Sequence, residues 1–236
     1  MPLRNLALVV VALAVACLSA AGPGTRFGVW DYRFGFTLLR WGAVLGLVGA
    51  VLTLVALLRS EPPRRTAGFV LLILVGLGVA ALPIQLRRSA RTVPPIHDIT
   101  TDTDDPPPFV AIAPLRADAP NPPEYAGADV AAQQRAAYPD IQPLRLAVPP
   151  ATAFERVRQA ARAMGWTIVA EVPAEGRLEA YAMTRFFGFV DDVVIRVRPD
   201  NDGSRVDIRS KSRVGRSDVG TNAKRIRAFV AELTGS

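Results

Sequence analysis

Three long apolar runs in the first 86 residues constrain this chain more than any other feature. They cover residues 6–21, 37–58 and 67–86, and Arg40 is the only charged side chain within them. A helix of about 20 apolar residues spans the hydrocarbon core of a bilayer, so the second and third runs are long enough to cross it. The first run is shorter, and it fits either a signal anchor or a signal peptide cleaved near Ser19 and Ala21. We therefore expect residues 1–91 to form a membrane anchor.

The positive charge of the chain belongs to this anchor. The full sequence of 236 residues has a net charge of +7, which is compatible with nucleic-acid binding. However, residues 1–91 contain 10 arginines against Asp31 and Glu61, whereas the remainder has 18 basic and 19 acidic side chains. Basic residues that flank apolar spans meet lipid headgroups and set orientation. The charge pattern thus predicts an integral membrane protein with no nucleic-acid partner.

The number of spans predicts that the C-terminal domain lies on the outer side of the cell membrane. The arginines near the span ends are almost evenly divided between the two sides, so the positive-inside rule does not decide the orientation. Three spans that start from an inner N-terminus leave the C-terminus outside. If the first run is cleaved, the new N-terminus is outside and two spans return the chain to that side. Both outcomes predict an inner-membrane protein with a periplasmic (or lumenal) C-terminal domain.

Small residues recur at a spacing of four in the second and third runs. Gly42, Gly46 and Ala50 form one row, and Gly76 and Ala80 form another. Such rows allow two helices to approach closely in a membrane. They predict a helix hairpin joined by the loop at residues 59–66, and a homo-oligomer through the same face is the alternative.

Residues 92–127 are rich in proline and predict an extended connector. Proline excludes a regular helix and forces extended backbone before each ring. The segment either crosses the surface of the following domain or acts as a spacer from the membrane. Residues 92–150 carry a net charge of −5 and residues 151–236 carry +4. The acidic connector is therefore also a candidate to lie against a basic face of the domain.

Residues 128–236 show the periodicities of a mixed domain. Period-two alternation predicts strands, and apolar stripes predict helices. The predicted strands are residues 144–148, 166–172, 177–184, 191–199 and 204–212, and the predicted helices are 129–138, 152–164 and 219–233. Thr152 and Glu155 fit a capping box. From residue 144 the order is β-α-β-β-β-β-α, which predicts an α+β two-layer domain, an antiparallel sheet packed against helices.

In this arrangement one face of the sheet is expected to be exposed. The side chains predicted to lie on this exposed face are those of Arg196, Arg198, Arg205, Asp207, Arg209 and Lys211. Five aromatic residues are expected to pack in the core, and they are Trp166, Tyr181, Phe186, Phe187 and Phe189.

Several motifs in the soluble part resemble one family. They are HDITTD at 97–102, DDPP at 104–107 followed by Phe109, FGFVDDVVIRVRP at 187–199 and SRVGRSDVGTNAKRIRAF at 212–229. Together they resemble the domain-of-unknown-function family 1499, over residues 97–233. The resemblance implies a bacterial membrane-anchored protein, and it carries no established activity that transfers to particular residues.

The stretch from Arg205 to Arg227 is the main candidate for a ligand site. It has 8 basic side chains against Asp207 and Asp218, and it runs from a strand into the N-terminus of the last helix. Free backbone N–H groups favour an anion there, and arginine suits phosphate or carboxylate. The ligand-binding candidates are Arg209, Lys211, Arg213, Arg216, Ser217 and Asn222. The alternative is structural: Arg213 and Arg216 pair with Asp191, Asp192 or the connector, and Ser217 or Asp218 is the helix cap.

The segment HDITTDTDD at 97–105 offers a second, smaller set of candidates. His97 and Asp98 are the catalytic candidates, and Asp98, Asp102 and Asp104 are candidates for a hard cation. The spacing lacks the glycine and the distal glutamate of an EF-hand loop, and Asx turns are the alternative use of such residues. His97 is the only histidine, which leaves little for a histidine-rich metal site or a histidine-paired hydrolase. We therefore expect no bound metal, and the absence of nucleotide-binding and hydrolase motifs predicts no cofactor.

Two functions follow from these patterns. The leading interpretation is a non-enzymatic, membrane-anchored envelope domain that binds an anionic partner, either a lipid headgroup or a protein. The alternative is an enzyme of unknown class that uses His97 and Asp98 beside the basic surface.

Overall fold

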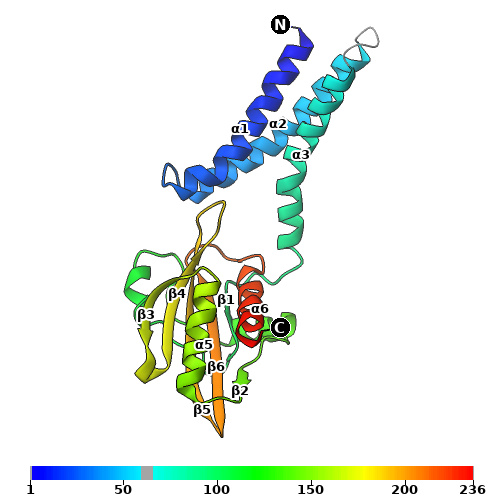
Figure 1. Cartoon of the computed structure of the whole chain (residues 1–236). Coiled ribbons are helices and arrows are strands. Elements are labelled where there is room, and N and C mark those ends of the chain that lie inside the picture. Colours follow the sequence, from blue (N-terminus) through cyan, green and yellow to red (C-terminus); the bar gives the residue numbers. More distant parts are fainter. Residues whose placement is uncertain (1, 60–65, 236) are drawn as a thin grey trace. The chain divides into compact units, whose positions relative to one another are not determined.

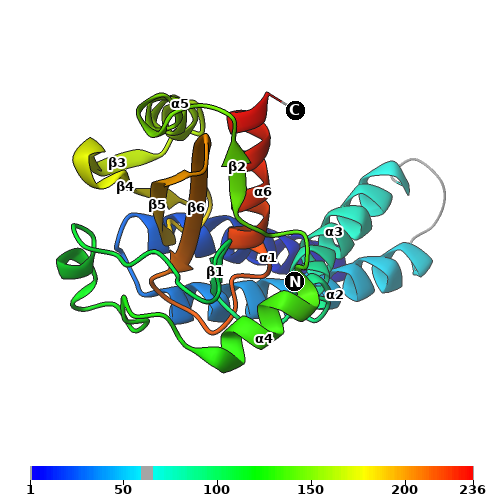
Figure 2. The same ribbon diagram turned by 90° about the horizontal axis from the view of Figure 1, so that it is seen from below.

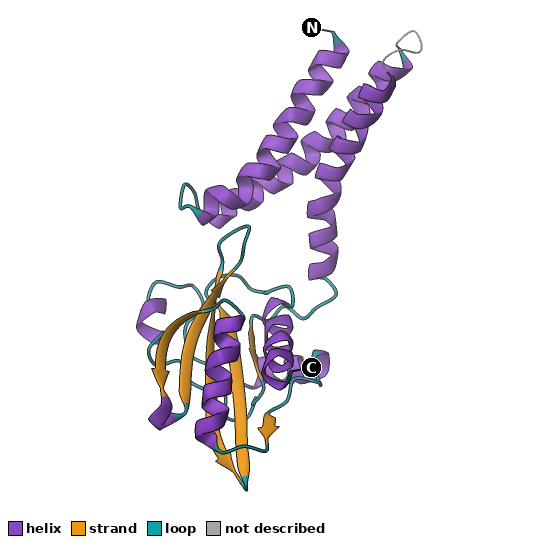
Figure 3. Ribbon diagram, in the orientation of Figure 1, coloured by secondary structure: helices purple, strands orange, loops and turns teal. Residues whose placement is uncertain are grey.

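The protein is described by a computed structural model that covers residues 2–59 and 66–235. It divides into two compact units, one of Met1–Ser89 with Arg185–Gly188 and one of Ala90–Thr184 with Phe189–Ser236. Figure 1 labels most elements and Figure 3 separates helices from strands. In chain order they are α1 (Leu3–Arg26), α2 (Tyr32–Leu58), α3 (Thr66–Ala90), β1 (Asp98–Thr100), η1 (Ala113–Arg116), α4 (Ala128–Ala137), β2 (Leu144–Leu146), α5 (Pro150–Ala163), β3 (Thr167–Val172), η2 (Pro173–Glu175), β4 (Arg177–Met183), β5 (Val190–Asp200), β6 (Gly203–Ser212) and α6 (Thr221–Thr234).

The three apolar runs form helices α1, α2 and α3. These helices have 24, 27 and 25 residues, and each is long and apolar enough to cross a membrane. Large apolar side chains such as Leu13, Val51 and Leu74 are more than half exposed on them, as expected for a surface that faces lipid. The three predicted apolar helices are therefore confirmed. Helix α1 extends beyond the predicted first run at both ends, and cleavage after that run stays a prediction.

Small residues bring α1 and α3 close to α2. A Cβ placed on Gly46 or on Gly76 would come within 2.6 Å of the carbonyl oxygen of the other glycine. A Cβ on Gly42 would meet the carbonyl oxygen of Ala14 in α1 at 3.2 Å. The rows seen in the sequence thus serve packing within the chain, and dimerisation through them stays a prediction. Residues 60–65, most of the predicted hairpin loop, lie outside the described residues.

The second unit contains an antiparallel sheet. The strand order is β1-β6-β5-β4-β3, and β2 pairs separately with β6. Strands β1 and β2 share one edge of β6, because Asp98 lies opposite Lys211 while Leu144 lies opposite Val206. From β2 to α6 the order is the predicted β-α-β-β-β-β-α, so the α+β class is confirmed. Strand β1 arises within the segment that the sequence predicted as connector.

Helices α5 and α6 cover one face of this sheet, here called the inner face (Figure 1). Leu178, Ile195 and Ile208 lie in register across β4, β5 and β6 and are almost fully buried. Val157 of α5 and Phe229 of α6 pack in the same apolar cluster. Burying each of these larger side chains stabilises the fold by about 1.5–3 kcal/mol. The inner face is therefore an ordinary apolar core.

Helix α5 begins two residues before the predicted capping box. Its first residue is Pro150, and no side-chain cap is present. Proline at the first helical position has its φ already set and no N–H that needs a partner, so it starts the helix without a cap. Glu155 pairs instead with Arg158 on the exposed surface. The capping-box prediction is therefore wrong, although the helix itself is confirmed.

The second face of the sheet, here called the outer face, is covered by the connector (Figure 2). Phe109 and Ile112 pack against Val194 of β5. Asp207, Arg209 and Lys211 each have at most 1% of their surface exposed. The prediction that these three side chains are exposed is wrong, because alternation along a strand shows which residues share a face and not what covers it.

Candidate functional site

The outer face holds most of the candidate residues, and its central feature is a buried ionic cluster around Asp98. Strand β1 places Asp98 opposite Lys211, and Arg209 lies two residues earlier on β6. Arg209 donates from Nε and Nη2 to the two carboxylate oxygens of Asp98, both at 2.8 Å. Lys211 Nζ lies 3.1 Å from the same carboxylate. All three side chains are at most 2% exposed. The two β6 cations therefore neutralise a carboxylate of the connector.

The remaining donors of this cluster bind connector carbonyls. Arg209 donates to the backbone oxygens of Pro107 and Pro123, and its guanidinium lies over the Phe109 ring at 4.8 Å. Lys211 donates to the Glu124 carbonyl. Burial lowers the pKa of Lys211, and the charge of Asp98 partly offsets that shift. Arg209 and Lys211, both predicted to bind ligand, are thus engaged within the fold.

A second ionic cluster forms around Asp192 of β5. Arg213 binds the Asp192 carboxylate with Nε at 2.9 Å and Nη2 at 2.8 Å. Arg116 of η1 donates to the same carboxylate at 2.6 Å, and both Arg116 and Asp192 have fully buried side chains. Burial lowers the pKa of Arg116, opposed by Asp192. The pairing of Arg213 with Asp192 is the structural alternative that the sequence left open.

The third cluster lies at the far end of the outer face. Asp102 of the connector and Asp207 of β6 meet three arginines, which are Arg196, Arg198 and Arg205. Asp102 also accepts the backbone N–H groups of Asp104 and Asp105 at 3.2 and 3.0 Å, which makes an Asx turn. Asp104 has 94% of its side chain exposed and faces Arg135. The three cation candidates Asp98, Asp102 and Asp104 therefore do not converge, and no group of metal-ligating side chains occurs in residues 2–59 and 66–235.

Sequence reasoning missed a carboxylate that holds the connector. Glu179 of β4 is fully buried and accepts the backbone N–H groups of Val110, Ala111 and Ile112. Arg177 on the same strand also binds it. Successive backbone N–H groups that converge on one carboxylate form an anion nest. The only sequence signal is an acidic residue among apolar neighbours in a strand, which does not show where its partners come from.

The β6–α6 loop, residues 213–220, holds the remaining ligand-binding candidates. Asp218 accepts the N–H groups of Gly220 and Asn222 at 2.9 and 2.6 Å. The N-cap residue of α6 is Gly220, so the prediction of Ser217 or Asp218 as the N-cap is wrong, although Asp218 binds amides at the start of the helix. Asn222 is fully buried, and its amide donates to the carbonyl of His97 at 3.0 Å. Ser217 Oγ accepts the N–H of Val219. Asn222 and Ser217 therefore have structural hydrogen bonds.

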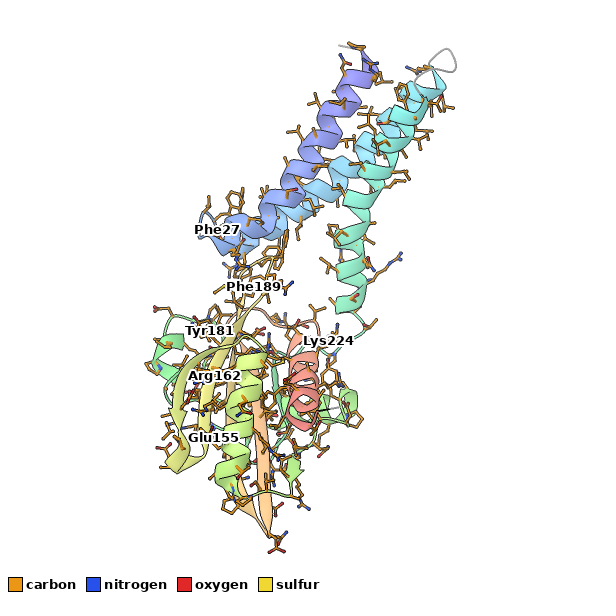
Figure 4. All side chains as sticks on the ribbon, in the orientation of Figure 1. Phe27, Glu155, Arg162, Tyr181, Phe189 and Lys224 are labelled. Carbon is orange, nitrogen blue, oxygen red and sulfur yellow. The ribbon has the colours of Figure 1, made fainter. Side chains whose placement is uncertain are left out.

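Arg216 differs from the other candidates of this surface. Its side chain is exposed, and within the described part of the chain no carboxylate lies within ion-pair distance of it. Its carbonyl faces His97 Nδ1 at 3.4 Å. Lys224, on the first turn of α6, is likewise exposed and has no ion pair among the described residues (Figure 4).

The two catalytic candidates do not form a dyad. Asp98 is engaged by Arg209 and Lys211, whereas His97 is half-buried and its ring faces the Arg216 carbonyl. Burial is the largest cause of the lowered pKa of His97, partly offset by that hydrogen bond. Among the described residues, the side chain of Arg213 contacts Asp192 and the Leu115 carbonyl, and it has no hydrogen bond or ion pair with His97 or Asp98. The geometry therefore offers no support to the enzyme alternative.

A cavity of about 270 Å³ opens on the outer face between the connector and β4–β5. It is lined by Pro107, Pro108, Val110, Glu175, Arg177, Val194 and Arg196. Arg177 and Arg196 lie directly opposite each other in the sheet, a repulsive arrangement for like charges. Carboxylates of Glu175, Glu179, Asp102, Asp105 and Asp207 neutralise them. The cavity therefore presents no excess of positive charge to an anion.

These features define a class of protein, in which an α+β domain follows apolar helices and its own connector closes one sheet face with ion pairs. The family model described as protein of unknown function DUF1499 matches residues 98–233, more than half of the chain. The chain belongs to this family, and the resemblance drawn from its motifs is confirmed. The match begins at Asp98, includes every strand of the sheet and ends within α6. A comparison with curated proteins finds no match.

Proposed function

We propose that this protein is a non-enzymatic, membrane-anchored envelope protein whose domain binds an anionic partner through Arg216 and Lys224. The partner that fits best is the headgroup of an anionic lipid, and an acidic protein surface is the rival. The observation that carries the proposal is the contrast within the predicted ligand surface: Arg209, Lys211 and Arg213 are paired with Asp98 or Asp192 inside the fold, whereas Arg216 is exposed and has no ion pair among the described residues.

The surroundings of the β6–α6 loop favour a lipid headgroup. The loop is held to the segment that leaves α3, because the N–H of Asp218 donates to the carbonyl of Ile96 at 3.1 Å. Ile96 follows Ala90, the last residue of α3, by only six positions. The intervening chain and the last turn of α3 carry Arg87, Arg88 and Arg91. Juxtamembrane basic residues each contribute about 1 kcal/mol of attraction to an anionic surface. Contacts of Arg216 and Lys224 with the same lipid surface would add to this attraction.

The buried clusters have a supporting role in this proposal. Asn222 and Asp218 fix the start of α6, and Arg213 ties the beginning of the loop to Asp192. A loop held in this way presents its exposed cations without a large loss of conformational entropy on binding.

Hydrogen exchange of the full-length protein in lipid nanodiscs tests the proposal. We expect residues 213–224 to exchange more slowly in nanodiscs that contain phosphatidylglycerol than in nanodiscs of phosphatidylcholine alone. The double variant Arg216→Glu, Lys224→Glu should abolish that difference. The matched control is Arg156→Glu, because Arg156 is also exposed and has no ion pair among the described residues, and α5 carries it away from the loop. Equal exchange in the two lipids for the natural sequence would contradict a lipid ligand.

The compartment is part of the same proposal. The two topologies drawn from the sequence both put the domain on the periplasmic face of the inner membrane. A C-terminal alkaline phosphatase fusion should therefore be active and a C-terminal green fluorescent protein fusion dark. The opposite result would place the domain in the cytoplasm.

A further inference from the structure

The β4–β5 loop, residues 184–189, carries an aromatic tip that the proposed headgroup contact does not use. Its sequence is Thr-Arg-Phe-Phe-Gly-Phe. Thr184 N–H donates to the Phe189 carbonyl at 2.8 Å, and the Phe189 N–H donates to Thr184 Oγ1 at 2.9 Å, so the loop is a closed turn. Gly188 has a φ of +70°, which allows the reversal. Loop tips of water-soluble domains are usually polar, so the three phenylalanines of this loop require a physical explanation.

Apolar side chains at and beside this tip are exposed, whereas the aromatic side chains of the apolar core are buried. Phe186 is 43% exposed, and Met183 just before the loop is 49% exposed. By contrast, Trp166 is buried and stacks on Phe229 at 5.3 Å in the core. The expectation of core packing is therefore wrong for Phe186. Exposed apolar residues gathered on one projection mark a surface for a partner or a membrane.

Residues 185–188 group with the apolar helices in the first compact unit. Within that unit Phe187 lies 5.1 Å from Phe36 of α2, and the ring of Phe186 fills the space where a Cβ on Gly22 of α1 would stand. The guanidinium of Arg26 donates to the Arg185 carbonyl. The tip therefore lies among residues at the shared end of α1 and α2.

That end of α1 and α2 has the composition of a membrane interface. Aromatic side chains gather around the α1–α2 turn, and they are Phe27, Trp30, Tyr32, Phe34 and Phe36. Figure 4 labels Phe27, which is 78% exposed. Arg26 and Arg33 flank the same turn. Aromatic belts with neighbouring arginines occur where the acyl chains meet the headgroups.

The position of the loop in the sheet agrees with this assignment. The carbonyl of Val190, at the start of β5, accepts the N–H of Arg213, and the carbonyl of His97 accepts the N–H of Ser212. The β4–β5 loop therefore leaves the sheet at the same end as the β6–α6 loop. That end also receives the chain from α3, through residues 91–97.

We propose that the β4–β5 loop inserts Phe186 and Phe187 into the interface of the membrane that anchors the protein, with Arg185 kept at the level of the phosphates. The attraction is apolar burial, so it does not require anionic lipid and is independent of the proposed headgroup contact. The loop gives the domain a second attachment to the bilayer, in addition to its peptide connection to α3.

Depth-dependent quenching in full-length protein tests this insertion. Cys17 is the only cysteine, so Cys17→Ala provides a background for single labels. An environment-sensitive fluorophore on Phe186→Cys, in nanodiscs of phosphatidylcholine, should emit at shorter wavelength and be quenched several-fold more by lipids with a shallow nitroxide than by lipids with a deep one. The matched control is Asp202→Cys in the exposed β5–β6 turn at the other end of the sheet, which should show neither effect.

Two results would overturn the proposal. Equal emission and equal quenching at the two labels would show that the tip stays in water. A blue-shifted label at position 186 that no lipid nitroxide quenches would show that protein, not lipid, covers the tip. Because the lipid is neutral, neither result depends on Arg216 and Lys224, and failure of the headgroup contact leaves this measurement unaffected.

Discussion

The two faces of the sheet are both buried, but different forces hold them. The inner face is covered by α5 and α6 and is apolar, with Leu178, Ile195 and Phe229 in its cluster. The outer face is covered by the connector and contains the buried ion pair between Asp98 and Arg209. Apolar burial tolerates imperfect partners, whereas a buried charge requires its specific counter-charge. A basic strand in a sequence is therefore not by itself a binding surface, since an acidic segment elsewhere in the chain can cover it.

The largest expected effect comes from removing one charge of the outer face. Asp98→Asn leaves Arg209 and Lys211 buried without a counter-charge, which should lower the free energy of unfolding by about 3–5 kcal/mol. Urea unfolding of the domain within the full-length protein, followed by pulse-labelling hydrogen exchange of β5 and β6, measures it. Asp104→Asn is the control, because this exposed carboxylate should contribute less than about 1 kcal/mol. Equal stabilities of the two variants would contradict the account.

A substitution on the inner face should act differently. Leu178→Ala opens a cavity in the apolar cluster and should cost about 2–5 kcal/mol. The two variants should differ in which backbone amides lose protection from hydrogen exchange first. Hydrogen exchange should show uniform loss of protection in Leu178→Ala, whereas Asp98→Asn should expose the connector amides first. If both variants lost protection in the same order, the two faces would not be separable.

Glu179→Gln should produce an intermediate loss. The amide keeps the size of the side chain but weakens the charge-assisted bonds from the N–H groups of Val110, Ala111 and Ile112, at a cost of about 1.5–3 kcal/mol. The same unfolding assay applies, and the exposed Glu175→Gln on η2 is the control. A loss no larger than the control's would show that the connector does not depend on this nest.

The smallest effect concerns pH. Burial lowers the pKa of His97 from its ordinary value of 6.5. Between this lowered pKa and 6.5, the unfolded chain then binds more protons than the folded chain. The free energy of unfolding therefore decreases as the pH falls through this window, and it keeps its full value above the window. His97→Gln should flatten the unfolding free energy against pH in this range. A slope unchanged by the substitution would assign the pH dependence to other groups.

Local sequence patterns predicted much of the fold, and they failed where partners are distant in sequence. Strands β3 to β6 and helices α5 and α6 follow from period and from turn residues within each segment. Strand β1 was missed because its three residues lie in a proline-rich stretch, and β6 specifies it as a pairing partner. Arg209 was assigned to an exposed face because its counter-charge Asp98 is 111 residues away. Proline at position 150 replaced the cap that Thr152 predicted.

For the candidate site, the sequence identified the residue types but not their partners. The pairing of Arg213 with Asp192 was among the alternatives, since it joins the ends of adjacent strands. The predicted N-cap was wrong by two residues or more, because a left-handed glycine, Gly220, takes that position. The anion nest around Glu179 involves backbone N–H groups, which have no signature in the side-chain sequence. Arg216 differs from the other basic candidates in being exposed and without an ion pair among the described residues, and no sequence pattern within the loop reveals this difference.

The central claim is that the connector is held on the outer face by buried polar contacts, so that this face is structural. Native-state hydrogen exchange of the amides of Val110, Ala111 and Ile112 tests it most directly, because in the structure all three donate to Glu179. We predict protection close to that of the central β5 and β6 amides, lost selectively in Glu179→Gln. Exchange of these amides at the rate of an unstructured chain in the natural sequence would contradict the account.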